Sequence, residues 1–511
     1  MNLANDSYEN TLRLSFHKDP ITLDPQQTCD KLSSAIIFLL FKGLTRLNTD
    51  HTIDNDIASS FYSLNDCKKY VFHLGNHYWS DGTQITAHDF VYSWKRALSP
   101  NFPARAVNFF YHIKNAAKAK KGRLALDKVG IRAENDKTLV VELENSCPYF
   151  PELTSFCPFF PLPYRAEQTE ISSITSGAFQ LESWEIGRQI LLKKNKLCSI
   201  PSDLDQIRIQ IIPDEKKAFA LFENNELDWI GDPISPLPVA YLPSLSLNKQ
   251  IKPLEGMLSC WFNTLKEPFN LPELRKAFSY AIPRRKLLGK LLLPPELLAK
   301  GLFSCIFEEQ DMFSVEESQD KAKELFRRAL NQLNLQKLDI TLSFEATDLF
   351  SRMAAQLKSC LEGSLDLCIQ LEPLPFKELF QRLRAQKFQA ALIHAVSQYT
   401  DPINFLERFE FKDTPRNFTG WEHQGYQETL NQYRKLIDPQ HKHELAKKAE
   451  KILLEEMPIA PIYYEHYAYL QKPHVHNLRI SPVGIVHFDR VILSKEPASQ
   501  IPNPELFHIV G

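Results

Sequence analysis

Residues 78–96 read YWSDGTQITAHDFVYSWKR and contain the clearest local structure signals in the chain. The Asp-Gly pair at 81–82 predicts a tight turn that follows a strand. Thr86 and Asp89 have the [ST]-x-x-[DE] spacing of a capping box, in which two side chains satisfy backbone N–H groups at a helix start. The residues after the box form one apolar stripe at helical spacing: Phe90, Val91 and Trp94. The stretch therefore predicts a strand, a turn, a short strand and a capped helix.

The amino-acid sequence of this stretch resembles a motif of the oligopeptide-binding family, which comprises the extracytoplasmic solute-binding proteins of peptide importers. Further segments resemble other motifs of that family and follow in the same order along nearly the whole chain. They are Thr22–Pro25 with Phe41–Leu44 (family LDP…FEGL), Ser176–Phe179 (NGAY), Phe262–Phe269 with Arg275–Ile282 (NNxKxPFxDxRVRxALxxAID), Lys321–Leu325 (EAKKLL) and Pro458–Tyr464 (PIVPVYY).

Bulk composition restricts the class of protein. The chain has 511 residues, which is too long for one core and suggests roughly three domain-sized units. Its formal charge is −2 with acids and bases interleaved, so no basic run indicates nucleic acid or an anionic membrane surface as a partner. The nine cysteines are widely spaced without a CxxC pair, which disfavours a zinc site or a dense disulfide framework. No secretory leader is visible, so for an exported protein we expect this chain to be the mature form.

Strand and helix patterns alternate through the second half of the chain, which predicts an α/β fold with mixed sheets covered on both faces. The resemblance implies a three-lobed periplasmic-binding-protein-like fold with a hinge between lobes I and III. The expected boundaries are 1–46, 170–255 and 476–511 for lobe I, 47–169 for an inserted lobe II, and 256–475 for lobe III.

Enzyme motifs are missing from the sequence: it has no GxGxxG, GxxxxGK[ST], HExxH or GxSxG pattern. Two H-x-H pairs, at 441–443 and 474–476, have no third ligand at a supporting spacing, so we expect neither a metal nor a cofactor. The interpretation is a binding protein without catalytic activity.

An extended peptide can form backbone hydrogen bonds with exposed strand edges, and these bonds do not depend on the identity of the peptide's side chains. The resemblance implies one ligand-contacting edge on lobe I and another on lobe III. The first maps to Cys29, Asp30, Lys31 and Leu32, and the second to His394, Ala395 and Val396.

One segment departs from the family pattern. Residues 395–402 read AVSQYTDP where the family has W-x-A-D-Y-x-E/D-P, whose Asp meets the α-amino group of the peptide. Gln398 replaces that Asp and Ala395 replaces the aromatic residue, while Ser397, Tyr399 and Asp401 complete the candidate site. A buried ammonium without a counter-charge costs several kcal/mol in effective terms. Either another acid, Asp401 or Asp30, takes over, or the preferred ligand has no free amino group there.

The sequence thus predicts a monomeric substrate-binding component of an ATP-driven peptide importer. We expect it in the periplasm or at the outer face of the cytoplasmic membrane, with a peptide ligand and the membrane permease subunits as partners. A relative tuned to a modified peptide such as a cell-wall fragment, or to another solute such as a nickel chelate, haem or a sugar, is the alternative. A free-standing hydrolase is the distant alternative.

Overall fold

The computed structural model describes residues 10–28, 30–165, 172–198, 202–238, 249–290, 293–294, 297–303, 316–414, 416–436 and 438–494. The chain divides into two compact units. Unit 1 comprises residues 1–251 and 467–511, and unit 2 comprises residues 252–466. Within the described ranges, no helix has the length and apolar character needed to cross a membrane.

The main sheet of unit 1 is built around β1 (Thr11–Phe16), which lies between β10 (Gln206–Ile211) and β11 (Trp229–Gly231) and runs parallel to both. Alternate residues of β1 are fully buried, as its sequence pattern predicts. The sheet continues through a hairpin, β9 (Gln189–Lys194) and β8 (Phe179–Glu185). Gly187 supplies the positive φ of the turn, +74°, which glycine adopts without a steric cost. The sequence of residues 175–195, two apolar strand patterns on either side of Gly187, predicts this hairpin.

The second sheet of unit 1 has the order β4-β5-β7-β6 and contacts helix α2 (Ala87–Leu98). Its strands are β4 (Ala58–Leu64), β5 (Lys69–Leu74), β6 (Ile131–Asn135) and β7 (Thr138–Glu142). Phe90 and Trp94 of α2 are fully buried, whereas Val91 is half-buried. The predicted capping box is present, because the Asp89 carboxylate accepts the Thr86 N–H at 2.7 Å.

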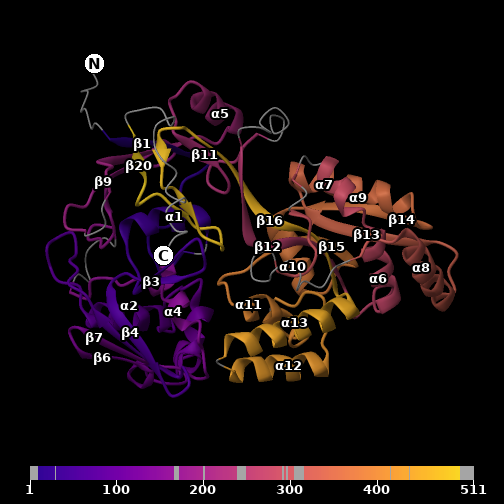
Figure 1. The fold of residues 1–511 in the computed structure, drawn as a ribbon, viewed down its shortest axis with the longest axis horizontal. Coiled ribbons are helices and arrows are strands. Elements are labelled where there is room, and N and C mark those ends of the chain that lie inside the picture. The colour runs from indigo at the N-terminus through magenta and orange to yellow at the C-terminus, as the bar shows by residue number, and fades with distance from the viewer. Residues whose placement is uncertain are drawn as a thin grey trace, which may run out of the picture. The chain divides into compact units, whose positions relative to one another are not determined.

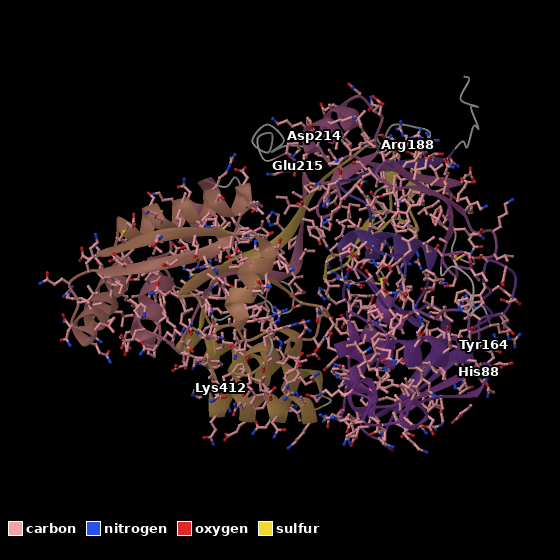
Figure 2. All side chains as sticks on the ribbon, turned by 180° about the vertical axis from the view of Figure 1, so that it is seen from behind. His88, Tyr164, Arg188, Asp214, Glu215 and Lys412 are labelled. Carbon is pink, nitrogen blue, oxygen red and sulfur yellow. The ribbon has the colours of Figure 1, made fainter. Side chains whose placement is uncertain are left out.

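The Asp89 carboxylate also accepts a hydrogen bond from the backbone N–H of Tyr164, at 3.0 Å. The ring of Tyr164 contacts the ring of His88 with centroids 5.9 Å apart, and Figure 2 shows the two side chains close to each other. The start of α2 is therefore fixed to the end of the aromatic-rich run 148–164.

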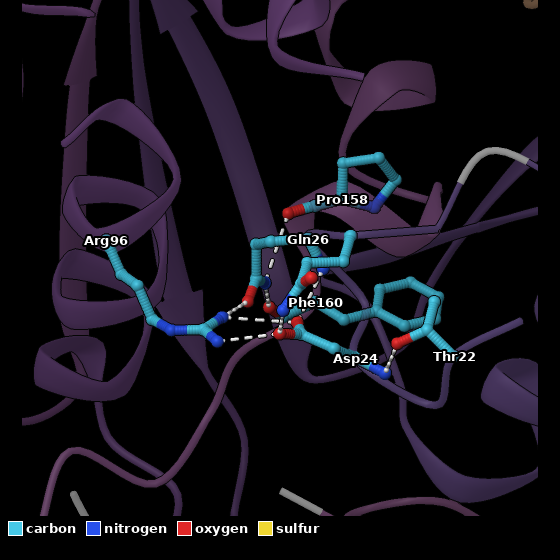
Figure 3. Close-up of polar contacts among 7 residues, drawn as sticks. Thr22, Asp24, Gln26, Arg96, Pro158 and Phe160 are labelled. Atoms are coloured by element: carbon cyan, nitrogen blue, oxygen red, sulfur yellow. Dashed lines mark hydrogen bonds and ion pairs between the residues drawn. The ribbon is translucent and has the colours of Figure 1, made fainter. Parts of the chain in front are cut away.

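The end of α2 is fixed to the chain's opening segment (Figure 3). Arg96 donates two hydrogen bonds to the Asp24 carboxylate, at 3.1 and 2.6 Å, and one to the Gln26 side chain at 2.9 Å. The Gln26 amide in turn donates to the carbonyl oxygens of Pro158 and Phe160. Two of the motifs that the sequence analysis singled out thus meet through this ion pair.

The remaining elements of unit 1 are short. They are β2 (Thr45–Leu47), β3 (Ile53–Asn55), β17 (Val475–His476), β18 (Arg479–Ile480), β19 (Val486–His487), β20 (Ile492–Leu493), α1 (Lys31–Leu40), α3 (Ala116–Lys120), α4 (Phe150–Leu153), α5 (Glu215–Glu223), η1 (Val107–His112), η2 (Leu126–Lys128) and η3 (Cys157–Phe159).

Unit 2 contains a mixed sheet in which the strands follow the order β14-β13-β15-β12-β16. Its strands are β12 (Gln250–Phe262), β13 (Leu338–Glu345), β14 (Leu367–Leu374), β15 (Ala390–Val396) and β16 (Ile459–Gln471), of which β12 and β16 extend beyond the unit's boundaries. β13, β14 and β15 run parallel, and β12 runs antiparallel to β15. Mixed sheets with intervening helices confirm the predicted α/β class.

The helices of unit 2 connect these strands or pack beside them, and α12 and α13 lie side by side (Figure 1). They are α6 (Pro272–Ala281), α7 (Arg284–Lys290), α8 (Gln319–Leu333), α9 (Asp348–Glu362), α10 (Phe376–Arg384), α11 (Ile403–Leu406), η7 (Glu407–Phe409), α12 (Gln424–Lys435) and α13 (Pro439–Glu456).

Candidate functional site

The unit 2 part of the predicted site is one continuous segment, which comprises the end of β15 and the turn leading into α11. His394, Ala395 and Val396 are the last three residues of β15. On one side β15 pairs with β12 as far as Val396, but on the other its pairing with β13 ends at Ala391. Among the described residues, no strand pairs with that second edge between Leu392 and Val396. The predicted segment therefore has an open strand edge.

Three hydrogen bonds hold the backbone of this segment. The Ser397 N–H donates to the Glu255 carbonyl oxygen at 2.7 Å, and the Gln398 N–H donates to the Asn404 side-chain oxygen at 2.7 Å. The guanidinium of the buried Arg408 donates to the Val396 carbonyl oxygen at 2.5 Å. The end of the open edge is therefore fixed by groups of unit 2 itself.

The His394 side chain is occupied by protein contacts. Its Nδ1 lies 2.7 Å from the Glu465 carboxylate, and its Nε2 lies 3.3 Å from the Tyr463 hydroxyl oxygen. The ring also contacts Phe350, with centroids 4.9 Å apart. Burial alone would lower the pKa of His394, but the neighbouring Glu465 carboxylate outweighs it and raises the pKa. We expect an imidazolium–carboxylate pair here, so His394 can offer a ligand its backbone rather than its ring.

Gln398, Tyr399 and Asp401 lie in the segment that departs from the family pattern, and their surroundings differ from one another. Gln398 is half-buried, and its side-chain amide makes no hydrogen bond with a described residue. Asp401 accepts hydrogen bonds from the Tyr433 hydroxyl at 2.6 Å and from Lys442 Nζ at 2.8 Å. Because Lys442 already compensates its charge, Asp401 is a poor replacement for the acid missing at Gln398. Tyr399 is buried, with 2% of its surface exposed.

The unit 1 part of the predicted site does not form a strand edge. Asp30 is the N-cap of α1 and accepts the Ser33 N–H at 2.9 Å, and Lys31 and Leu32 are the first two residues of the helix. The expectation of an extended edge at these residues is wrong, because the Asp30 cap and the apolar run after it favour a helix. Cys29 lies outside the described residues. That residues 30–32 contact a ligand stays a prediction.

The side chains of this group are partly engaged within unit 1. Lys31 Nζ donates to the Val483 carbonyl oxygen at 2.6 Å, and Leu32 is 5% exposed. The second carboxylate oxygen of Asp30 is buried and has no hydrogen-bond partner among the described residues. Of the two acids considered as replacements, Asp30 is thus the one with an unused oxygen.

The structure adds two acids near His394 that sequence reasoning missed. Glu465 lies on β16 and Glu345 is the last residue of β13. The sequence contained no signal for either, because Glu345 and Glu465 lie 49 and 71 residues from His394 in the chain and approach it only through the pairing of distant strands.

Comparison with known proteins gives consistent results. A family model described as bacterial extracellular solute-binding proteins, family 5 middle, matches residues 52–416. The oligopeptide-binding protein OppA of Bacillus subtilis is 30% identical over 502 residues, which cover 94% of this chain and 92% of that protein. The probable deoxycholate-binding periplasmic protein YgiS of Escherichia coli is 28% identical, over 91% of this chain and 90% of that protein.

Among solved structures, the Escherichia coli murein tripeptide binding protein MppA has a TM-score of 0.77 at 24% identity. The comparison covers 95% of this chain and 99% of that one. At this level of identity the likeness establishes a shared fold, which is the periplasmic-binding-protein-like fold expected from the sequence.

Proposed function

The chain belongs to the bacterial extracellular solute-binding proteins, family 5, and from this premise we propose that it captures peptides outside the cytoplasm and delivers them to the permease subunits of an ATP-driven importer. The observation that carries the proposal is the open edge of β15 between Leu392 and Val396. That edge lies within the segment that the family resemblance assigned to ligand contact. The protein binds and releases its ligand without chemical change.

Strand addition explains how the edge would work. A peptide in extended form would pair its N–H and C=O groups with the free backbone groups of β15. β12 and the Arg408 contact hold the edge in place, so little ordering of the protein is required when the peptide binds. Because backbone pairing does not depend on the identity of the side chains, this part of the site accepts peptides of many sequences. Closure of lobes I and III over the ligand, with the boundaries given above, is part of the proposal.

A second candidate, a peptide whose amino terminus is blocked or absent, is favoured by one observation. Gln398 occupies the position of the family's amino-terminal anchor, and the nearby Asp401 is already paired with Lys442. Gln can accept a hydrogen bond but cannot neutralise an ammonium. A modified peptide such as a cell-wall fragment would meet no unpaired charge at this position.

Calorimetry with a tripeptide and its N-acetylated form tests both candidates. We expect wild type to bind the two forms about equally. Gln398→Asp should favour the free form by about 1.5–3 kcal/mol, because a hydrogen bond to a charged partner contributes that much. Gln381→Asp, which adds the same charge at an exposed position of α10, is the control and should leave the ratio unchanged.

Two other outcomes are informative. Rejection of the acetylated form by wild type would contradict the second candidate and show that another acid anchors the amino group, for which Asp30→Asn is the first variant to measure. Failure to bind any peptide, together with mass spectrometry that finds a non-peptide solute co-purified with the protein, would refute peptide capture.

A further inference from the structure

β13 and β15 diverge at their carboxyl ends, and the opening between them is called the fork here. The two parallel strands pair at Leu342 with Ala390 and at Ser343 with Ala391. Beyond these pairs β13 continues to its last residue beside β14, and β15 continues to its last residue beside β12. Among the described residues, neither of the facing edges beyond the last pair has a strand partner.

This fork has the position at which ligands bind in open α/β sheets. The chain leaves β13 through α9 to β14, on the side away from β15, whereas it leaves β15 toward α11. Crevices outside the carboxyl ends of parallel strands, where neighbouring connections diverge, are the common ligand positions of such sheets. A ligand strand on the open edge of β15 would therefore lie beside the last residue of β13, Glu345.

Glu345 brings a second carboxylate to the fork, beside the Glu465 carboxylate that pairs with His394 at 2.7 Å. The residue is half-buried, and its carboxylate makes no direct hydrogen bond or ion pair with a described residue. Burial raises the pKa of Glu345, and the charge of His394 opposes that change. His394 thus interacts with two carboxylates, Glu465 and Glu345, so a ligand cation beside Glu345 would stabilise the second of them.

We infer that Glu345 anchors a cationic group of the ligand at the fork, so that this chain prefers peptides that carry a lysine-type ammonium. The inference rests on the proposed function and names a charge preference that strand addition alone would not give. The anchored group is therefore a side-chain ammonium, and binding of the terminal ammonium at Glu345 is the competing outcome of the test.

Calorimetry on the full chain tests this assignment with matched peptides. The probes are alanine tripeptides with lysine at each of the three positions, their norleucine counterparts, and the N-acetylated form of each. For at least one position, wild type should bind the lysine peptide about ten- to a hundredfold more tightly than the norleucine peptide, as expected for a charge-assisted hydrogen bond. Glu345→Gln should bring this ratio close to one.

The control variant is Asp339→Asn, which removes a carboxylate from an exposed position near the other end of β13 and should leave the ratio unchanged. Unchanged affinity of Glu345→Gln for the N-acetylated norleucine peptides, which carry no ammonium, shows that the variant is folded. If Glu345→Gln weakens binding of the free norleucine peptides but not of their acetylated forms, Glu345 binds the terminal ammonium, and the lysine preference is refuted.

The result that overturns the inference is a lysine-to-norleucine ratio that stays the same in Glu345→Gln. Peptide binding without any cation preference has the same consequence, and it leaves the proposed function intact. Absence of binding to every peptide refutes the proposed function instead, so the two failures are distinguishable.

Discussion

Replacement of Arg96 by Met should destabilise unit 1, because it removes the ion pair that joins α2 to the chain's opening segment. The Asp24 carboxylate is 5% exposed and receives two of its hydrogen bonds from Arg96 (Figure 3). Met keeps much of the side-chain volume but removes the guanidinium, whose Cζ lies 4.0 Å from the centroid of the Phe102 ring. The substitution therefore tests the charge with its hydrogen bonds and its cation–π contact.

The magnitude follows from what remains around Asp24. Removal of one partner of a buried ion pair costs about 3–5 kcal/mol. Asp24 keeps hydrogen bonds from the Gln26 N–H at 3.0 Å and from the Gln27 side chain at 2.8 Å, and Arg96 is 19% exposed. Both facts reduce the loss, so we expect the free energy of unfolding to fall by about 2–4 kcal/mol.

Equilibrium unfolding in guanidinium, followed by tryptophan fluorescence, measures this change. Arg188→Met is the matched control, since Arg188 forms an ion pair with Glu185 at the surface (Figure 2) and is 71% exposed. That variant should lose less than about 1 kcal/mol. Asp24→Asn completes a double-mutant cycle with Arg96→Met, and the coupling energy should be about 1–3 kcal/mol. Equal losses for Arg96→Met and Arg188→Met, or a coupling energy near zero, would refute the reasoning.

Three further predictions concern other elements. Thr86→Ala should lower the free energy of unfolding by about 1 kcal/mol through loss of the cap of α2, and calorimetry should find ligand affinity unchanged. Gly177→Ala should prevent folding or lower the melting temperature strongly, because its Cβ would lie 2.2 Å from a backbone carbonyl oxygen, whereas Gly289→Ala, with open space around it, should be tolerated. The pKa of His394 is raised and that of Glu465 is lowered by their pairing, which outweighs burial in each case. The stability that the pair provides should be complete between pH 4.5 and 6.5, the usual pKa values of the two groups. It should decline as the pH rises from 6.5 to the raised pKa of His394 or falls from 4.5 to the lowered pKa of Glu465, and it should be lost beyond those values. The difference in unfolding free energy between wild type and Glu465→Gln, measured against pH, checks this.

Elements with strong local signals were predicted well from the sequence. The sequence pattern predicts a strand over 11–16, a helix over 272–281 and a hairpin turn near Gly187, and β1, α6 and the turn between β8 and β9 have these positions. In each case alternation, a proline at the first helical turn or a glycine with positive φ determines the structure within a few residues. Such signals do not depend on how distant parts of the chain pair.

Elements that depend on distant pairing were predicted less well. Because Pro253 and Gly256 interrupt the strand pattern, the sequence predicts a strand that begins only at Leu258, whereas β12 begins at Gln250. Its length is set by its neighbours in the sheet, which local propensity does not report. At residues 30–32 the local sequence signal was correct, and the strand edge expected from the family resemblance was wrong. An Asp directly before an apolar run is a helix-start signal, and it predicts the observed local structure better than the expected edge does.

The residues shared with the family's motifs are used mainly to hold the fold together. Asp24 pairs with Arg96 at the end of α2. Gly43 and Gly177 lie so close to backbone atoms that a Cβ would collide with them. Arg275 donates hydrogen bonds to the carbonyl oxygens of Phe269 and Glu456.

A resemblance carried by such residues predicts the scaffold and therefore the class of protein, but it does not predict the ligand. Ligand selection depends on residues that the motifs leave free to vary and that the sheet brings to one place. Gln398 changes the charge where the family binds an amino terminus. Glu345 ends a strand 53 residues earlier in the chain and adds a half-buried carboxylate at the fork beside β15. If both assignments hold, this protein differs from its relatives in where along the peptide it requires a positive charge, and the lysine and acetylation series measure that difference directly.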